Sequence, residues 1–341
     1  MTSRRNFLKL SGALTALSFI EQSFVWENGS SVNKTIKPHR LQQGDTVAIT
    51  SPAGAVWDEK QLIIFENILQ TIGFKVILGK TLYQKFGYFS GTDEFRANEL
   101  TSFFENTDIK GIFCMKGGWG CARILDKLNF DIIKNNPKLL IGFSDITTLL
   151  NGIYKKTGLV TFHGPVGNSG WNDFTTTAFK KIIMENNTAE ISLTAGEKDS
   201  WQCITKGIAQ GELIGGNLTV LSGIIGSSYI PDFKGKILFL EEAKEEPYSI
   251  DRMLTQLKLC GALDKINGFI FGKCNKCDAE DPQKAFTFME VLEQHIKPLG
   301  IPAISGASFG HTENKLTIPI GIMAELNTEK GILKLMETAT I

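Results

Sequence analysis

The chain has 341 residues, 42% of them hydrophobic, which is enough for two ordinary domains with cores of their own. It carries 36 basic and 36 acidic residues, so its formal net charge is zero. This balance favours neither a nucleic-acid partner nor an anionic membrane surface. The 34 glycines indicate many tight loops but are too few for a low-complexity chain.

The first 25 residues differ in character from the rest of the chain. The basic segment Ser3-Arg-Arg-Asn-Phe-Leu-Lys9 precedes a weakly apolar stretch, Leu10–Ile20, that is too short to anchor in a membrane. This order is typical of a signal peptide, and the segment matches the twin-arginine pattern (S/T)-R-R-x-F-L-K. We therefore predict a signal peptide over residues 1–25, export through the twin-arginine machinery and a periplasmic location.

From residue 45 onward, short apolar strands alternate with amphipathic helices, which predicts parallel βαβ units in a doubly wound α/β sheet over residues 40–170. The expected strands are Thr46–Thr50, Phe74–Leu78, Lys110–Met115 and Lys138–Phe143. The expected helices are Gln61–Ile72, Thr92–Asn106 and the segment after Ser144, and Cys121–Asn135 should be largely helical. The loops after parallel strands meet at one edge of such a sheet, where ligands bind. The loops that should become neighbours there are Ser51–Gly54, Lys116–Gly120, Phe143–Asp145 and Phe162–Pro165.

Residues 171–209 are more polar and less periodic, so we interpret them as a connection to a second domain over residues 210–341. In that domain we expect strands at Lys236–Glu242 and Gly268–Gly272, and a helix at Ser249–Leu259. Residues 321–326 and 331–336 predict a terminal hairpin. This half mixes strand directions and contains less helix than the first.

The six cysteines are irregularly spaced and do not form a disulfide scaffold in a chain of this length. Cys274 and Cys277 make a single C-x-x-C motif, whereas a zinc site needs further ligands that the nearby sequence lacks. We interpret this motif as structural or incidental, and we predict neither a metal site nor a cofactor.

Ser144 stands between a buried strand and an amphipathic helix, and this position allows two interpretations. As a helix N-cap, its Oγ would accept a backbone N–H. As a nucleophile, it would sit on a strand-to-helix elbow, with the free N–H groups of the helix aimed at an oxyanion. The sequence around it is G-x-S-D and not the full G-x-S-x-G motif. Local sequence alone favours the cap.

A serine nucleophile needs a base and an orienting carboxylate. His163 and His311 both lie in loops beside glycine, and either could be the base. Glu241 and Glu242 end an apolar strand. Since adjacent strand residues point to opposite faces, we expect one of these carboxylates to face solvent and the other to face inward, where it needs a partner such as a histidine N–H.

The loop Lys116-Gly-Gly-Trp-Gly120 lets backbone N–H groups approach a ligand closely. It fails as a dinucleotide fingerprint because the third glycine and the following acidic residue are missing. As an oxyanion-hole donor, however, it needs a single well-aimed N–H.

Several motifs in this order together resemble the LD-carboxypeptidase family of serine peptidases, and the resemblance runs from about Gly44 to the C-terminus. Its markers are Ser51–Gly54, Gly87–Asp93 with Arg96, Lys116–Gly120, Gly142–Thr147, His163–Pro165, Leu213–Leu218, Gly235–Glu242, Ile250–Arg252 and Gly306–His311. One departure is Lys116, where the family usually has arginine. Lysine cannot form a bidentate contact with a carboxylate.

The resemblance implies a Ser-Glu-His triad, with Ser144 as the nucleophile, Glu241 as the orienting carboxylate and His311 as the base. It implies an oxyanion hole made by the backbone N–H groups of Gly118 and Asp145, and it leaves His163 a structural or substrate-side role. It also implies a flavodoxin-like N-terminal domain, a β-rich C-terminal domain and a homodimer.

The activity implied is that of an L,D-carboxypeptidase that removes the terminal D-alanine from murein tetrapeptides. One alternative in the same family is a peptidase for acylated small peptides or peptide–nucleotide antibiotics of the microcin C type. An alternative of another class is an exported peptide-binding protein that uses the same cleft without turnover.

Overall fold

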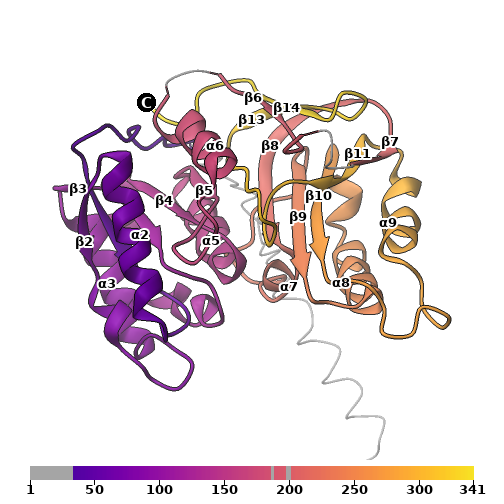
Figure 1. Ribbon diagram of the computed structural model, residues 1–341. Coiled ribbons are helices and arrows are strands. Elements are labelled where there is room, and N and C mark those ends of the chain that lie inside the picture. Colours follow the sequence, from indigo (N-terminus) through magenta and orange to yellow (C-terminus); the bar gives the residue numbers. More distant parts are fainter. Residues whose placement is uncertain (1–33, 186–187, 197–200) are drawn as a thin grey trace, which may run out of the picture. The chain divides into compact units, whose positions relative to one another are not determined.

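The structure, a computed structural model, describes residues 34–185, 188–196 and 201–341. The signal peptide expected over residues 1–25 lies outside the described residues. Buried apolar side chains from two β-sheets form one continuous core. Figure 1 shows the N-terminal strands of the first sheet on the left, in indigo to magenta, and the second sheet on the right, in tones from rose to yellow.

The first sheet has six strands in the order β12-β5-β4-β3-β1-β2. Five of them run parallel and come from the N-terminal half: β1 (Thr46–Thr50), β2 (Lys75–Leu78), β3 (Ile109–Cys114), β4 (Leu139–Gly142) and β5 (Thr161–His163). The sixth, β12 (Ile318–Ile320), comes from near the C-terminus and pairs antiparallel with β5. The expected doubly wound parallel sheet is therefore confirmed, with an edge strand that the sequence did not predict.

The helices of this half are α2 (Glu59–Ile72), α3 (Asp93–Glu105), α4 (Phe130–Asn135) and α5 (Thr147–Thr157). The segment Cys121–Asn135 is largely helical, as predicted, but it is divided into two helices. A 3-10 helix, Cys121–Lys127, ends where Leu128 is extended, and Asn129 then caps α4 by accepting a hydrogen bond from the N–H of Ile132 at 3.1 Å. Asparagine is a preferred N-cap, so it starts a new helix at this point.

The second sheet has eight strands in the order β6-β14-β13-β8-β9-β10-β11-β7. Its centre is parallel and consists of β8 (Ile208–Asn217), β9 (Ile237–Ala243), β10 (Gly268–Asn275) and β11 (Ala303–Ala307). The predicted terminal hairpin is present as β13 (Met323–Asn327) and β14 (Ile332–Leu335). The helices here are α7 (Leu218–Ser222), α8 (Pro247–Leu259) and α9 (Phe288–Ile296).

The segment 171–209, which we interpreted as a connection, carries α6 (Asp173–Ile183), β6 (Glu190–Ser192) and β7 (Gln202–Thr205). The two strands lie at opposite edges of the second sheet. β6 pairs with β14 and β7 pairs with β11, both antiparallel.

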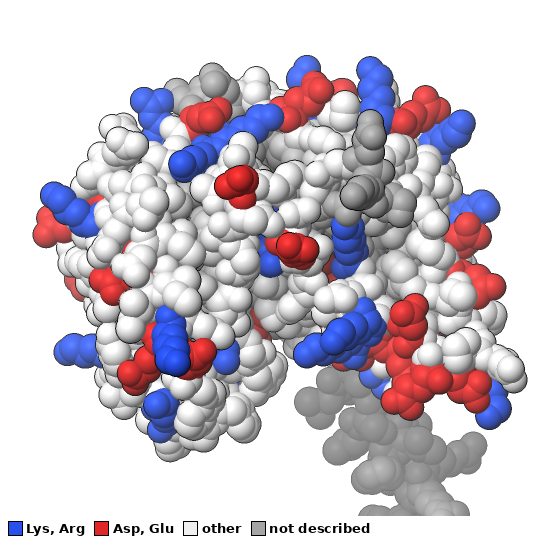
Figure 2. Space-filling view, in the orientation of Figure 1, with Lys and Arg blue, Asp and Glu red and all other residues white. Residues whose placement is uncertain are grey.

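Basic and acidic side chains are interspersed over the face shown in Figure 2. Within the described ranges, no helix is long and apolar enough to cross a membrane.

Candidate active site

Ser144 follows β4 directly and has a backbone φ of 63°, in the left-handed region that non-glycine residues rarely adopt. The cap positions before the 3-10 helix Ser144–Ile146 and before α5 are Phe143 and Ile146, and neither makes a side-chain capping bond. Ser144 Oγ forms no hydrogen bond with another residue that the structure describes. The N-cap interpretation is therefore wrong, and the turn has the strained backbone of a nucleophile elbow.

The loops that the sequence placed at one edge of the first sheet do lie together. Gly54 N–H donates to the carbonyl of Gly117 at 3.2 Å, and Gly164 N–H donates to the carbonyl of Gly142 at 3.0 Å. A Cβ added to Gly117 would lie 2.9 Å from Ser144 Oγ. Only glycine therefore lets the double-glycine loop pack directly against the serine side chain.

The backbone N–H groups of Gly118 and Asp145 are the two predicted oxyanion donors, and neither donates a hydrogen bond to any residue in the described ranges. The Asp145 carboxylate ties their two loops together, because its Oδ2 accepts the N–H of Cys121 at 2.8 Å. Burial raises the pKa of Asp145, and the Cys121 N–H opposes that rise. The turn that carries Ser144 and the glycine loop are thus held in a fixed relation.

Glu241 and His311 form the second half of the site, from β9 and from the loop after β11. Glu241 is fully buried, and its Oε2 lies 2.8 Å from His311 Nδ1 and accepts the backbone N–H of His311 at 3.1 Å. A carboxylate accepts from Nδ1–H, so it fixes the tautomer in which Nε2 carries the free lone pair. This is the arrangement of a general base and its orienting carboxylate.

Electrostatics in this pair favour the charged carboxylate and the protonated imidazole. Burial alone would raise the pKa of Glu241, but the hydrogen bond from His311 and its charge lower it below the ordinary value. Burial likewise acts to lower the pKa of His311, and the bond to Glu241 outweighs it and raises that pKa. The imidazolium that forms when His311 accepts a proton is thereby stabilised.

Glu242 has a different role from its neighbour. Its Oε2 accepts the N–H of Thr219 at 2.8 Å, and its Oε1 accepts from the Asn217 amide at 3.1 Å, so the carboxylate caps the start of α7. Glu242 is 3% exposed and Glu241 is 0% exposed. The expectation that one of the two carboxylates faces solvent is wrong, because hydrogen-bond donors inside the protein meet each of them.

His163, the other histidine considered as a base, ends β5 and is fully buried. Its ring contacts Phe143, Phe239 and Phe309 edge-on at centroid distances of 5.5 to 6.1 Å, and neither ring nitrogen has a hydrogen-bond partner among the described residues. Burial lowers its pKa to about 4. His163 is therefore a neutral packing residue behind the site, and His311 is the histidine that lines the same cavity as Ser144.

That cavity has a volume of about 450 Å³ and contains both Ser144 and His311. No hydrogen bond yet joins Ser144 Oγ to His311 in the described structure, and such bonds commonly tighten only with substrate. The remaining lining residues are Lys116, Gly117, Gly118, Phe143, Val166, Asn168, Ser169, Gly170, Asn275, Thr312 and Lys315. Sequence reasoning missed Lys315, whose one signal is a charge next to the apolar segment Leu316–Ile320.

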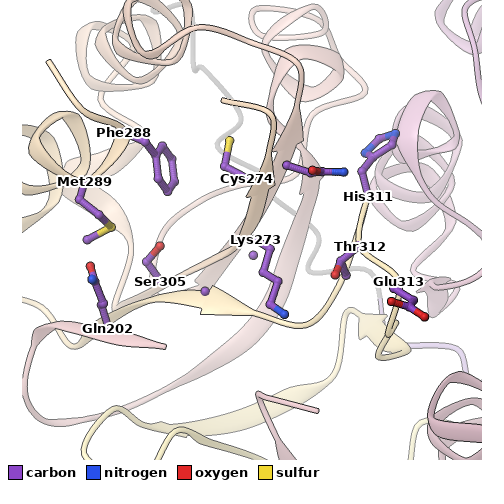
Figure 3. Close-up of a pocket in the computed structure, with 12 residues that line it drawn as sticks. Gln202, Lys273, Cys274, Phe288, Met289, Ser305, His311, Thr312 and Glu313 are labelled. Atoms are coloured by element: carbon purple, nitrogen blue, oxygen red, sulfur yellow. The ribbon is translucent and has the colours of Figure 1, made fainter. Parts of the chain in front are cut away.

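His311 and Thr312 also line a second cavity of about 490 Å³. Figure 3 shows Phe288 and Met289 on one side of this cavity and the segment His311–Glu313 on the other. Cys274, another lining residue, forms a disulfide with Cys277, so the C-x-x-C motif is structural, as expected. In the part of the chain that is described, no cluster of three or more His, Cys, Asp or Glu side chains is arranged to hold a metal ion.

Both halves of the chain match models of one protein family. Residues 47–164 match the model of the LD-carboxypeptidase N-terminal domain, and residues 210–326 match that of the C-terminal domain. The chain is 37% identical over 301 residues to a probable murein peptide carboxypeptidase of Bacillus subtilis (strain 168), covering 86% of this chain and 92% of that protein.

Two solved structures show the same fold. MccF in complex with glutamyl sulfamoyl guanosine superposes with a TM-score of 0.84 at 30% identity, covering 89% of this chain and 99% of that one. Muramoyltetrapeptide carboxypeptidase from Oxalobacter formigenes superposes with a TM-score of 0.75 at 29% identity, covering 85% of this chain and 97% of that one. The present chain belongs to the LD-carboxypeptidase family and is a serine-type carboxypeptidase.

Proposed function

We propose that this protein is an L,D-carboxypeptidase that removes the terminal D-alanine from murein tetrapeptides during peptidoglycan recycling or remodelling. The observation that carries the proposal is the buried Glu241–His311 pair, 2.8 Å apart, in a site that also presents Ser144 on a strained turn. The relatives named as murein peptide and muramoyltetrapeptide carboxypeptidases support this choice of substrate.

The proposed mechanism is acyl transfer through Ser144. His311 Nε2 takes the proton from Oγ, while Glu241 holds the ring and stabilises the imidazolium. Oγ attacks the carbonyl of the penultimate residue, and the N–H groups of Gly118 and Asp145 donate to the oxyanion. The C–N bond then breaks, and His311 passes its proton to the leaving amine of D-alanine. Water, activated by the same histidine, releases the acyl group and restores Ser144.

Mass spectrometry of muropeptides tests the proposal directly. The purified protein is incubated with stems of three, four and five residues, and we expect it to shorten the tetrapeptide to the tripeptide by one alanine. Ser144→Ala should abolish this conversion, whereas Ser102→Ala, which removes an exposed hydroxyl on α3, should not change it. Conversion by Ser144→Ala at the wild-type rate would contradict the serine mechanism.

Two other activities remain outcomes of the same assay. The similarity to MccF favours acylated small peptides or peptide–nucleotide conjugates as a second substrate class, and cleavage of such a conjugate in preference to the tetrapeptide would select it. A peptide-binding protein without turnover would bind the tetrapeptide and leave its mass unchanged.

We also propose that the protein is exported by the twin-arginine route to the periplasm and works there as a homodimer. The Ser3–Lys9 segment supports the export route. Replacing Arg4 and Arg5 by lysine should leave the protein in the cytoplasmic fraction.

Light scattering of the mature protein should give twice the mass of one chain, and a mass of one chain would contradict the dimer.

A further inference from the structure

Lys315 is a nearly buried cation in the wall of the catalytic cavity. Lys315 is only 7% exposed and lies in the chain between His311 and β12. Its backbone N–H donates to Thr175 Oγ1 at 3.1 Å, which fixes the residue against α6. The ammonium group donates to the carbonyl oxygen of Thr312, next to the candidate base.

The ammonium also lies close to the reacting groups. Lys315 Nζ is 5.8 Å from the centroid of the Phe143 ring, and the His311 ring contacts that same ring edge-on at 4.9 Å. Phe143 immediately precedes Ser144. The cation therefore stands in the same small space as the nucleophile and the base, where the C-terminal end of a peptide substrate has to lie.

No described carboxylate forms an ion pair with Lys315, and the nearby Glu241 pairs through its Oε2 with His311. An ammonium has three donors, and one of them is used, by the Thr312 carbonyl. Burying a cation without a counter-ion is costly. Burial lowers the pKa of Lys315, and the charges of Glu241 and Glu313 oppose that change. A group held at this cost next to a catalytic pair indicates an anionic ligand.

We propose that Lys315 binds the free terminal carboxylate of the peptide and so restricts the enzyme to the last residue of its substrate. This inference rests on the proposed function, because it takes the substrate to end in an unblocked D-amino acid. Lys116 is the other lysine of the cavity, but its Nζ donates to the carbonyl of Ala55 at 3.2 Å, toward the loop after β1.

The test measures binding in a Ser144→Ala background, so that it does not depend on turnover. Calorimetry compares a tetrapeptide that ends in D-alanine with the same peptide as its C-terminal amide. We expect Ser144→Ala to bind the acid at least tenfold more tightly than the amide. Adding Lys315→Met should weaken binding of the acid by about 10- to 100-fold, the range for hydrogen bonds to charged groups, and leave the amide within about threefold.

Two matched variants complete the design. Lys315→Arg keeps the charge and should restore part of the preference for the acid, and Lys116→Met should leave the preference in place. The proposal is overturned if the parent shows no preference for the acid, if Lys315→Met weakens both ligands equally, or if Lys116→Met removes the preference instead. Wild-type turnover of the tetrapeptide is scored separately and tests the proposed function. Thermal melting confirms that each variant is folded.

Discussion

At the scale of single residues, one buried oxygen of Glu241 determines what His311 can do. It accepts from both the ring and the backbone N–H of His311, and so fixes the position and tautomer of the imidazole. The same contact raises the pKa of His311 against the opposing effect of burial. Because the base must be neutral to accept the Ser144 proton, activity should rise with pH as His311 loses its proton.

Glu241→Gln tests whether the charge of Glu241 sets the pKa of His311. The amide removes the negative charge that raises the pKa of His311, so burial should lower this pKa. The acid limb of kcat/KM should therefore move to lower pH. At the plateau kcat should fall by about 10³-fold or more, because the imidazolium loses its partner. The measurement is the pH profile of tetrapeptide hydrolysis. Glu242→Gln is the matched control, since that carboxylate caps α7, and should move the limb less. An unmoved limb in Glu241→Gln would contradict the assignment.

His163 makes stability depend on pH in the acid range. Its folded-state pKa of about 4 lies below the unfolded value near 6.5, so the unfolded chain binds the extra proton between these pH values. Stability contributed by the neutral ring is present above pH 6.5 and is lost as the pH falls toward 4. The loss amounts to about 3 kcal/mol at its lower end.

Replacement of His163 by phenylalanine, which matches its aromatic neighbours, should remove this dependence. Urea unfolding at pH 7.5 and pH 5 should give a smaller difference in the free energy of unfolding than in the wild type. His39→Phe, at an exposed position, is the control and should retain the wild-type difference. If His163→Phe retains it as well, the acid sensitivity has another source.

The sequence carries unequal signals for the residues of this site. The sequence does not distinguish Glu241 from Glu242, because both lie at the end of one strand and both accept hydrogen bonds inside the protein. The backbone φ of Ser144 has no local sequence signature, so the capping interpretation was the natural local choice. The order of several motifs, and not any single residue, singled out Ser144, Glu241 and His311. Lys315 was missed because its partners come from α6 and from the His311 loop.

At the scale of elements, short glycine loops bring the strand ends into contact with the site. Gly310 precedes the candidate base and has a φ of 81°, and a Cβ there would collide with the Glu241 carboxylate. The loop therefore places His311 on Glu241 only if residue 310 is glycine. Periodicity found the strands around this loop, but it carries no information about a collision between residues 69 positions apart.

Gly310→Ala should displace the carboxylate and lower kcat by at least 10²-fold, because a small misplacement of catalytic groups is sufficient for that loss. Gly300→Ala is the matched control. Gly300 also has a positive φ, 65°, but a Cβ there meets no atom within 4 Å. It should cost about 1 kcal/mol of stability and leave kcat unchanged. Equal kinetic losses in both variants would show that backbone strain, and not the collision, is responsible.

At the scale of the whole described unit, the two sheets are tied together by the segment that carries the base. This segment leaves the second sheet after β11, passes Glu241 at His311, meets α6 at Asn314 and Lys315, and enters the first sheet as β12. The alternation of strands and helices predicted the first sheet. It did not predict that the chain returns to this sheet as β12, since an edge strand of three residues has no distinctive period. The site is therefore complete only when both sheets are folded.

Ile318, fully buried in β12, tests this coupling. Ile318→Ala should cost about 2–5 kcal/mol, the usual range for a buried aliphatic side chain. Two tryptophans report on the folding of the two halves. The Trp171 ring lies 5.6 Å from the Phe65 ring in the first half, and Trp201 lies against Gly331 in the terminal hairpin. In variants that retain Trp171 or Trp201 as the single one of the chain's five tryptophans, urea unfolding followed by fluorescence should give coincident midpoints, and Ile318→Ala should lower both midpoints equally. Ile208→Ala, at a 60% exposed position, should shift neither. A shift confined to Trp171 would show that the halves unfold independently and that the catalytic groups can separate without global unfolding.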